Sequence, residues 1–174
     1  EAWEDFARNA RSLVGNLDRL GYWAEIRERL ERALVAVREQ LDTPKLEAML
    51  LNGLGMIAYK RVEWERAIAM YEQSLETYER LGDVHGMAKT FNNLGMVYAD
   101  KGEWDRAIET YELCLETYER VGDVHGMAQT WVNLGIVFRL KGEWDRAIEM
   151  YELCLETFER AGDVHGMAQT FNNL

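Results

Sequence analysis

The chain has 174 residues, of which 48% are hydrophobic, 29% are charged and one is proline, a balance that excludes an intrinsically disordered protein. Lys and Arg number 20 against 31 Asp and Glu, so the formal net charge is -11. Nucleic acids and anionic membrane surfaces recruit basic proteins, and we therefore expect no nucleic acid and no membrane as a partner.

The chain also lacks the sequence features of a membrane-spanning or secreted protein. Its longest stretch without Asp, Glu, Lys or Arg runs from Val124 to Phe138, which is shorter than the roughly 20 apolar residues of a membrane span. No signal peptide is visible at the N-terminus. We expect a cytoplasmic protein. Because the sequence begins at Glu1 and ends at Leu174 within a repeat, we interpret it as a piece of a longer protein.

A 40-residue repeat organises the sequence. The heptapeptide GDVHGMA begins at Gly82, Gly122 and Gly162, and GEWDRAIE begins at Gly102 and Gly142. Each unit contains two stretches with apolar residues at helical spacing, which predicts a pair of helices. We predict a degenerate N-terminal helical pair over residues 1–43, repeats over 44–82, 83–122 and 123–162, and a half repeat over 163–174.

The helix boundaries follow from local signals. We expect nine helices, starting near residues 2, 22, 44, 63, 83, 103, 123, 143 and 163, and no strand. Thr43 and Pro44 offer an N-cap and a first-turn proline to the third helix. Gly102 and Gly122 suit the left-handed position that ends a helix, and Asp123 is placed to cap the next one.

One helix pair cannot bury its apolar face alone, so the pairs must stack. Small residues recur where two helices would approach closely, namely Gly55, Gly95, Gly135, Ala67, Ala107 and Ala147. The predicted fold is all-α, a right-handed α-solenoid of antiparallel helix pairs. Its concave wall would consist of the first helices and its convex wall of the second helices.

Two stretches of the sequence, within residues 91–111 and 131–151, resemble the pattern of a known repeat family. Trp131-x2-Leu134-Gly135-x2-Phe138, followed by Ala147-x3-Tyr151, resembles the tetratricopeptide pattern, and so do Phe91, Leu94, Gly95, Tyr98, Ala107 and Tyr111. The resemblance covers about residues 44–174. The long period and the GDxxG turn are similar to the repeats of kinesin light chains, of Leu-Gly-Asn adaptors and of the sensor arms of bacterial STAND-type signalling ATPases. The resemblance implies a noncatalytic module that binds a protein or peptide on its concave wall.

Groups for catalysis or metal binding are few and regularly spaced. The histidines, His85, His125 and His165, occur once per repeat and would lie roughly 10 Å apart, too far to share an ion. Cys114 and Cys154 have the same separation, beyond the reach of a disulfide, and we expect both to be reduced and buried. We predict no catalytic residue, no metal site and no cofactor. We interpret Trp64, Trp104 and Trp144 as covers of the helix junctions, and the glutamates of the second helices as a solvated outer face.

The differences between repeats indicate where a ligand would bind. Residues 87–126 and 127–166 differ at ten of 40 positions, and five of those differences are mild. The other five are Lys89/Gln129, Asn92/Val132, Met96/Ile136, Ala99/Arg139 and Asp100/Leu140. Helical spacing places these five on one stripe of the first helix, which the resemblance implies is the inner wall. We interpret the stripe as a groove for an irregular partner; relaxed drift or a designed consensus array are the alternatives.

The predicted groove residues extend this stripe to neighbouring repeats. They are Asn52, Met56, Tyr59, Lys60, Lys89, Asn92, Asn93, Met96, Asp100, Gln129, Asn133, Ile136, Arg139 and Asn172. An amide side chain both donates and accepts hydrogen bonds, and resemblance to the light-chain and adaptor repeats implies that Asn52, Asn92, Asn133 and Asn172 bind peptide backbone. Alternatively, the asparagines bond to a neighbouring helix.

A second functional hypothesis is a structural one. The half repeat carries Ala168, Phe171 and Leu174, which have no second helix to cover them in the sequence. Such an exposed apolar end would allow the array to form a homo-oligomer.

Overall fold

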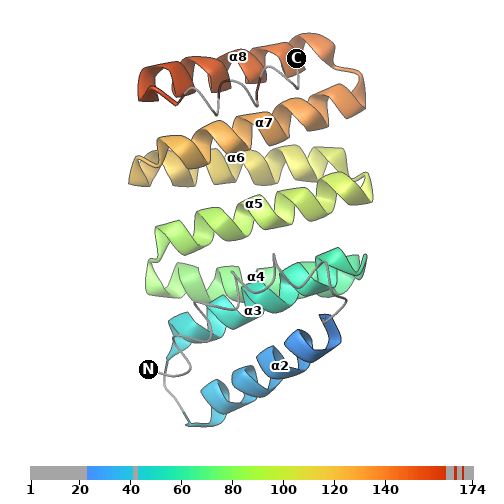
Figure 1. Cartoon of the computed structure of the whole chain (residues 1–174), viewed down its shortest axis with the longest axis vertical. Helices are drawn as coiled ribbons and strands as arrows, with labels where there is room; N and C mark the ends of the chain where they lie inside the picture. Colours follow the sequence, from blue (N-terminus) through green and yellow to red (C-terminus); the bar gives the residue numbers. More distant parts are fainter. Residues whose placement is uncertain (1–22, 41–42, 164–166, 168–169, 171–174) are drawn as a thin grey trace. The chain divides into compact units, whose positions relative to one another are not determined.

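The computed structural model describes residues 23–40, 43–163, 167 and 170, and every regular element in this part of the chain is a helix. The chain divides into two compact units, Glu1–Asp83 and Val84–Leu174. The first unit contains α2 (Trp23–Gln40), α3 (Pro44–Lys60) and α4 (Trp64–Leu81). The second contains α5 (Val84–Lys101), α6 (Trp104–Val121), α7 (Val124–Lys141) and α8 (Trp144–Ala161), as Figure 1 shows.

The predicted helix starts agree with these bounds. Seven of the nine predicted helices lie in the described part of the chain, and each begins within one residue of its predicted start. The helix predicted near residue 2 lies outside the described residues. Of the helix predicted near residue 163, only Met167 and Thr170 are described, and both are helical. The all-α fold class is therefore confirmed.

Most of the predicted helix ends are also correct. Gly102 and Gly122 have φ angles of 81° and 66°, which lie in the left-handed region. The Asp123 side chain accepts a hydrogen bond from the Gly126 amide at 2.9 Å and so caps α7. Asp and Gly residues at the breaks thus set these helix ends locally.

The predicted side-chain cap at Thr43 is wrong. Its hydroxyl makes no capping hydrogen bond to α3. Instead, its carbonyl oxygen accepts from the amides of Leu46 and Glu47 at 3.0 and 3.1 Å, and Pro44 at the first position has no amide hydrogen to satisfy. The backbone therefore already satisfies the donor that the Thr43 hydroxyl would have bonded.

A tyrosine on a glycine sets the distance between the two helices of each pair. The Tyr71 ring of α4 lies on Gly55 of α3, where an added Cβ atom would be 2.7 Å from ring atom Cε1. The same contact recurs between α6 and α5 and between α8 and α7, with ring atoms 2.5 Å from the corresponding position. Each of the three tyrosines is only 2% exposed. The predicted close approach at the glycines is confirmed, and tyrosine is the residue that packs against them.

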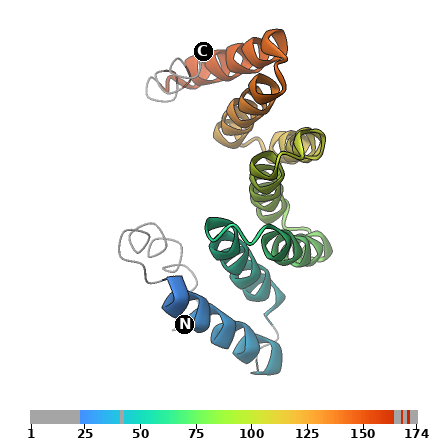
Figure 2. The same cartoon turned by 90° about the vertical axis from the view of Figure 1, so that its right-hand side faces the viewer.

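In the second unit, α6 packs against both α5 and α7 (Figure 2). The buried Cys114 thiol donates to the Ala88 carbonyl of α5 at 3.2 Å and lies 3.5 Å from the Thr130 hydroxyl of α7. At the surface, the Lys141 ammonium group forms an ion pair with Asp105 of α6 at 2.6 Å. The cysteine is buried as predicted, and it also supplies a polar link among three helices.

The tryptophans do not all cover the helix junctions. Trp64 is half-buried and packs on Tyr59 with 5.7 Å between ring centroids, but Trp144 is 62% exposed. One period after Tyr59 the chain has Ala99, and two periods after it has Arg139. Trp144 therefore lacks the aromatic neighbour that shields Trp64, and the prediction is wrong for Trp144.

Val62 has a strained backbone conformation that predicts a stabilising substitution. Its φ is 62°, and one period later the chain has Gly102. A β-branched residue in the left-handed region costs about 1–3 kcal/mol. We expect Val62→Gly to raise the free energy of unfolding by about 1 kcal/mol, because the strain relieved exceeds the entropy that glycine adds to the unfolded chain. Urea unfolding followed by circular dichroism measures the change.

The reciprocal variant is the control for Val62. Gly102→Val places the same side chain in the same turn of the second unit and should lower the stability by about 1–3 kcal/mol. Equal stability of Val62→Gly and the unmodified chain would contradict the assignment of strain to this residue.

Alanine substitutions at two glycines of α3 distinguish the effect of close packing on stability from the effect of helix propensity. At Gly55 an added Cβ atom would overlap the Tyr71 ring, whereas at Gly53 the nearest atom is Leu30 Cδ1 at 3.4 Å. We expect Gly55→Ala to destabilise the protein by about 1–3 kcal/mol through overpacking. Gly53→Ala should instead be neutral or stabilising by up to about 1 kcal/mol, because alanine favours the helix. Unfolding curves of both variants test this, and a loss of equal size at both sites would refute the packing argument.

Candidate functional site

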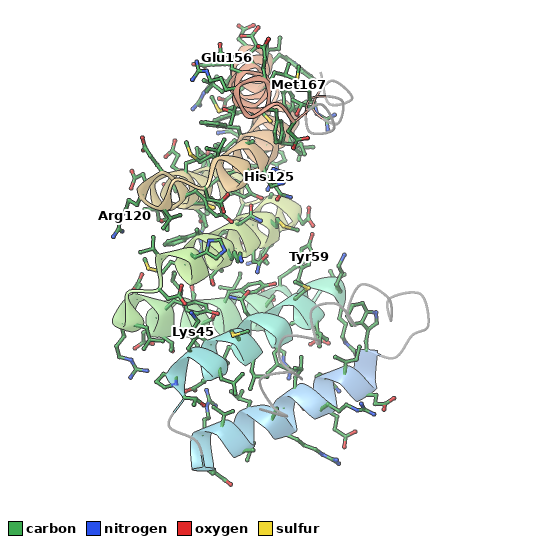
Figure 3. All side chains as sticks on the ribbon, turned by 60° about the vertical axis from the view of Figure 1, so that its left-hand side comes forward. Lys45, Tyr59, Arg120, His125, Glu156 and Met167 are labelled. Atoms are coloured by element: carbon green, nitrogen blue, oxygen red, sulfur yellow. The ribbon has the colours of Figure 1, made fainter. Side chains whose placement is uncertain are left out.

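The predicted groove residues lie on α3 in the first unit and on α5 and α7 in the second. None of those that are described is buried. The half-buried ones are Asn52, Met56, Tyr59, Lys89, Asn92, Asn93, Met96, Asn133 and Ile136, and the exposed ones are Lys60, Asp100, Gln129 and Arg139. Figure 3 shows Tyr59 in the last turn of α3. Asn172 lies outside the described residues. We name the residues on α5 and α7 that change chemistry the variable stripe: Lys89, Asn92, Met96, Ala99 and Asp100 on α5, and Gln129, Val132, Ile136, Arg139 and Leu140 on α7.

In the second unit, two predicted site residues are joined directly. The Asn133 side chain of α7 donates from Nδ2 to Asn92 Oδ1 of α5 at 3.0 Å. The Asn92 Nδ2 atom lies 4.0 Å from the Met96 sulfur, which is a weak acceptor. The amides therefore link two first helices across adjacent repeats. This is the structural role that the sequence left open as an alternative.

In the first unit, Asn52 also has a partner within the protein. Its Nδ2 atom donates to the Ser74 hydroxyl of α4 at 3.0 Å, and that hydroxyl donates to the Ala48 carbonyl at 2.8 Å. A half-buried amide is thus held by a buried serine at the position where the next repeat has Cys114. Contact of these asparagines with a ligand stays a prediction.

The accessible surface of the variable stripe differs in charge and polarity between the two helices. On α5 the stripe contains a cation and an anion, Lys89 and Asp100. On α7 the same positions are Gln129 and Leu140, and a cation, Arg139, is added. Leu140 is 50% exposed. A ligand that contacts both helices would therefore meet different chemistry on each.

The second helices present a more uniform surface. Their glutamates are exposed, as predicted for a solvated face; they include Glu109, Glu112, Glu116, Glu119, Glu149, Glu152, Glu156 and Glu159. Figure 3 shows Glu156 on α8, where it forms an ion pair with Arg160 at 3.3 Å. These residues are identical in α6 and α8.

The histidines make local polar contacts. His85 Nδ1 and His125 Nδ1 each lie 3.8 Å from an aspartate of the next repeat, Asp123 and Asp163 respectively. One period earlier, Lys45 pairs with Asp83 at 2.6 Å, and both Lys45 and His125 lie in the first turn of a helix (Figure 3). Each of the two described histidines thus lies beside one aspartate of the next repeat. Within residues 23–40 and 43–163, no three His, Cys, Asp or Glu side chains converge as metal ligands.

The cysteine chemistry does not favour nucleophilic catalysis. Burial raises the pKa of the Cys114 thiol to about 12, and burial also raises the pKa of Cys154. A nucleophilic cysteine needs its thiolate form near neutral pH, which low exposure disfavours. Both thiols are protonated structural groups at pH 7.

Comparison with known proteins adds the family. The tetratricopeptide repeat profile matches residues 48–81, 86–160 and 126–174. The chain belongs to the tetratricopeptide repeat family. No curated protein sequence matches it. Among the described helices of this tetratricopeptide repeat protein, none combines the length and the hydropathy needed to cross a bilayer.

Solved structures support the same fold at low sequence identity. BtubC (BKLC) from P. vanneervenii is 18% identical with a TM-score of 0.74, and the match covers 98% of this chain and 86% of that one. Aspartyl phosphate phosphatase F from Bacillus subtilis is 14% identical with a TM-score of 0.84, over 95% of this chain but 43% of that one. TPR-like repeats attributed to a kinesin light chain of Podosopora anserina are 14% identical with a TM-score of 0.73, over 95% and 85% of the two chains.

Some residues that shape this tetratricopeptide surface were not among the predicted site residues. Ser74 holds Asn52, and the Tyr151 ring packs on Gly135 of α7 with its hydroxyl near the Arg139 guanidinium. The signal was present in the sequence, since a tyrosine follows each of Gly55, Gly95 and Gly135 at the same distance of 16 residues. In the sequence, Tyr111 and Tyr151 were assigned only to the tetratricopeptide pattern and not to the surface that they shape.

The Asn92–Asn133 bond predicts a measurable coupling. In a double-mutant cycle with Asn92→Ala, Asn133→Ala and the double variant, we expect an interaction free energy of about 0.5–1.5 kcal/mol. The cycle removes the gain in helix propensity that each alanine brings, because that gain appears in the single and the double variants alike. Urea unfolding provides the four free energies.

A cycle between Asn92 and Glu116 is the matched control, because Glu116 is exposed on α6 and has no such bond to Asn92. Its coupling should be within about 0.3 kcal/mol of zero. An Asn92–Asn133 coupling as small as this control value would show that the bond contributes nothing to stability.

Proposed function

We propose that this tetratricopeptide protein is a noncatalytic module that binds a peptide or a helix of a partner protein on the exposed faces of its first helices. The observation that carries the proposal is the accessibility of the variable stripe. Each of its ten residues is half-buried or exposed, although α5 and α7 share their buried alanine, leucine, glycine and valine positions. Apart from the buried Tyr98, which is Phe138 in α7, the changes of charge and polarity between these two helices lie at positions that a partner could contact.

The proposed ligand contacts divide by chemistry. Met96 and Ile136 supply half-buried apolar surface, while Asp100 and Arg139 supply charges of opposite sign for local selectivity. Asn92 and Asn133 hold each other, and the capacity for hydrogen bonding that remains on their amides is available to peptide backbone. On α3, Met56, Tyr59 and Lys60 would play the same roles, with the Lys60 ammonium 5.8 Å from the Tyr59 ring centroid.

We further propose that the chain is a sensor or adaptor arm of a larger cytoplasmic signalling protein. Membership of the tetratricopeptide family and the similarity of the fold to kinesin light chain repeats support this role. The protonated thiols and the separated histidines support a noncatalytic role. The net charge of -11 favours a protein partner over nucleic acid or an anionic membrane.

Self-assembly of the array stays a second prediction. Its proposed contact residues, Ala168, Phe171 and Leu174, lie outside the described residues. In the second unit, exposed Leu140, Trp144 and Ile148 add apolar surface around the turn between α7 and α8.

The chain itself supplies the variant that tests peptide binding. Changing Gln129→Lys, Val132→Asn, Ile136→Met, Arg139→Ala and Leu140→Asp gives α7 the stripe of α5, whose scaffold already accommodates those residues. A peptide selected on the unmodified chain from a random 12-residue phage library should bind this graft at least tenfold more weakly, about 1.4 kcal/mol. Isothermal titration calorimetry measures the affinities, and thermal unfolding verifies that the graft is folded.

The five mild differences provide a matched control. The variant with Trp131→Phe, Phe138→Tyr, Met150→Thr, Phe158→Tyr and Ala161→Val also gives residues 127–166 the side chains of residues 87–126, but leaves the stripe unchanged. It should keep the affinity within about twofold. An equal loss in both variants, or no loss in the graft, would reject the stripe as the binding surface.

A further inference from the structure

The thioether of Met96 on α5 lies beside a hydrogen-bond donor. The Nδ2 atom of Asn92, four residues earlier, is 4.0 Å from the Met96 sulfur. The other end of the same amide is held, because Asn92 Oδ1 accepts from Asn133 Nδ2 at 3.0 Å. A thioether sulfur is a weak acceptor, so the N–H group beside it gains little from the contact. The amide would therefore bind this sulfur more strongly if the sulfur carried an oxygen.

Oxidation of the thioether supplies that oxygen. A lone pair of the sulfur attacks one oxygen of hydrogen peroxide, and the S–O bond forms while the O–O bond breaks. The second oxygen takes the proton of the first and leaves as water, so that sulfur is oxidised and the peroxide is reduced. The product, methionine sulfoxide, is polar and chiral, and it exists as two epimers. One epimer places its oxygen, a strong acceptor, on the side of the Asn92 amide.

The asparagine and the methionine occur together along the chain. On α3 the pair is Asn52 and Met56, with the same spacing of four residues, whereas α7 has Val132 and Ile136 instead. Residues at this spacing lie on the same face of a helix, so an amide and a sulfur can meet. Two of the five changes within the variable stripe thus remove the donor and the oxidisable sulfur at once.

The two pairs differ in their surroundings. On α3 the Asn52 amide donates to Ser74, and Met56 packs against the hydrophobic cluster of the first unit. On α5 both residues of the pair are half-buried members of the variable stripe. A half-buried side chain is accessible to a small oxidant, and the polar product at Met96 has the Asn92 donor beside it instead of an apolar core. Oxidation is therefore better accommodated at Met96 than at Met56.

We propose that Met96 is a site of reversible oxidation by hydrogen peroxide, and that its sulfoxide oxygen accepts a hydrogen bond from Asn92 Nδ2. The new bond extends the existing contact into a chain of three side chains, from Asn133 through Asn92 to Met96. Methionine sulfoxide reductases restore the thioether, with one enzyme for each epimer. The modification site itself does not depend on a ligand.

Oxidation also changes the surface that the proposed ligand contacts. The sulfoxide replaces an apolar contact by a polar one, and it takes up the Asn92 donor that peptide backbone would otherwise use. We expect the oxidised chain to bind the phage-selected peptide about fivefold more weakly. This consequence, unlike the modification, rests on the proposed function.

The ratio of the two epimers tests the bond to Asn92 without any ligand. The folded full chain is treated with dilute hydrogen peroxide, and its peptide digest is analysed by mass spectrometry before and after treatment with each epimer-specific reductase. We expect about a threefold or greater excess of one Met96 epimer, because a net hydrogen bond favours it. Asn92→Val, which supplies the side chain of Val132, removes the donor and should give both epimers in similar amounts.

Met96→Ile is the matched control for the other methionines, because α7 already has Ile136 at this position. Peroxide oxidises the remaining methionines of this variant as well, so the difference between the two treated chains isolates the effect of Met96. Treatment should weaken peptide binding of the unmodified chain, and it should leave the affinity of Met96→Ile within about twofold of its untreated value. Isothermal titration calorimetry measures the four affinities.

Each contrary result overturns a stated part of the proposal. If Met96 stays reduced while the exposed Met49 is oxidised, Met96 is not a modification site. If both Met96 epimers form equally, or if Asn92→Val leaves their ratio unchanged, Asn92 does not bind the sulfoxide. If the peptide binds the reduced and oxidised chains alike, the effect on recognition is wrong and the proposed function stands. If no library peptide binds either form, the proposed function fails, and the epimer ratio still decides the modification site.

Discussion

The contact between a tyrosine ring and the backbone of a glycine is the constraint on which the rest of this protein depends. With ring atoms 2.5–2.9 Å from where a Cβ atom would stand, Gly95 and Gly135 permit a distance between helices that alanine would not. The tyrosines are almost completely buried in this contact. Because each ring covers one face of a first helix, the stripe on another face of that helix is left for other partners.

Most of the fold could be predicted because its signals are local and repeated. Gly102 and Gly122 mark helix ends through a backbone conformation that few other residues adopt, and Asp123 caps through a bond to a residue three positions away. Such signals need no knowledge of distant contacts. The two errors have different causes. The Thr43 carbonyl accepts the hydrogen bonds of the first turn in place of its hydroxyl, whereas Trp144 lacks the aromatic partner that Trp64 has in Tyr59.

The candidate site was predictable at the level of a helix face but not at the level of single bonds. Comparison of two repeats identified the variable stripe, and every member is accessible. The sequence could not decide whether Asn92 and Asn133 face a ligand or each other, because that depends on the offset between adjacent first helices. The bond joins residues 41 positions apart, one more than the repeat period, so it pairs non-equivalent residues of the two repeats. Val132, the repeat copy of Asn92, therefore does not interrupt it.

This offset changes what the asparagines contribute. An amide held at one end by a neighbouring helix has fewer rotamers to lose when a ligand binds at its other end, so a structural bond and a role in recognition are compatible. The same reasoning distinguishes Tyr151 from the asparagines. Asn92 bonds to a neighbouring first helix, whereas Tyr151 is buried beside the Arg139 guanidinium, a cation that varies between repeats. Duplication has thus kept the packing tyrosine in each repeat while the residue above it changed from Tyr59 to Ala99 to Arg139, so that a conserved scaffold contact presents a different chemistry in each unit.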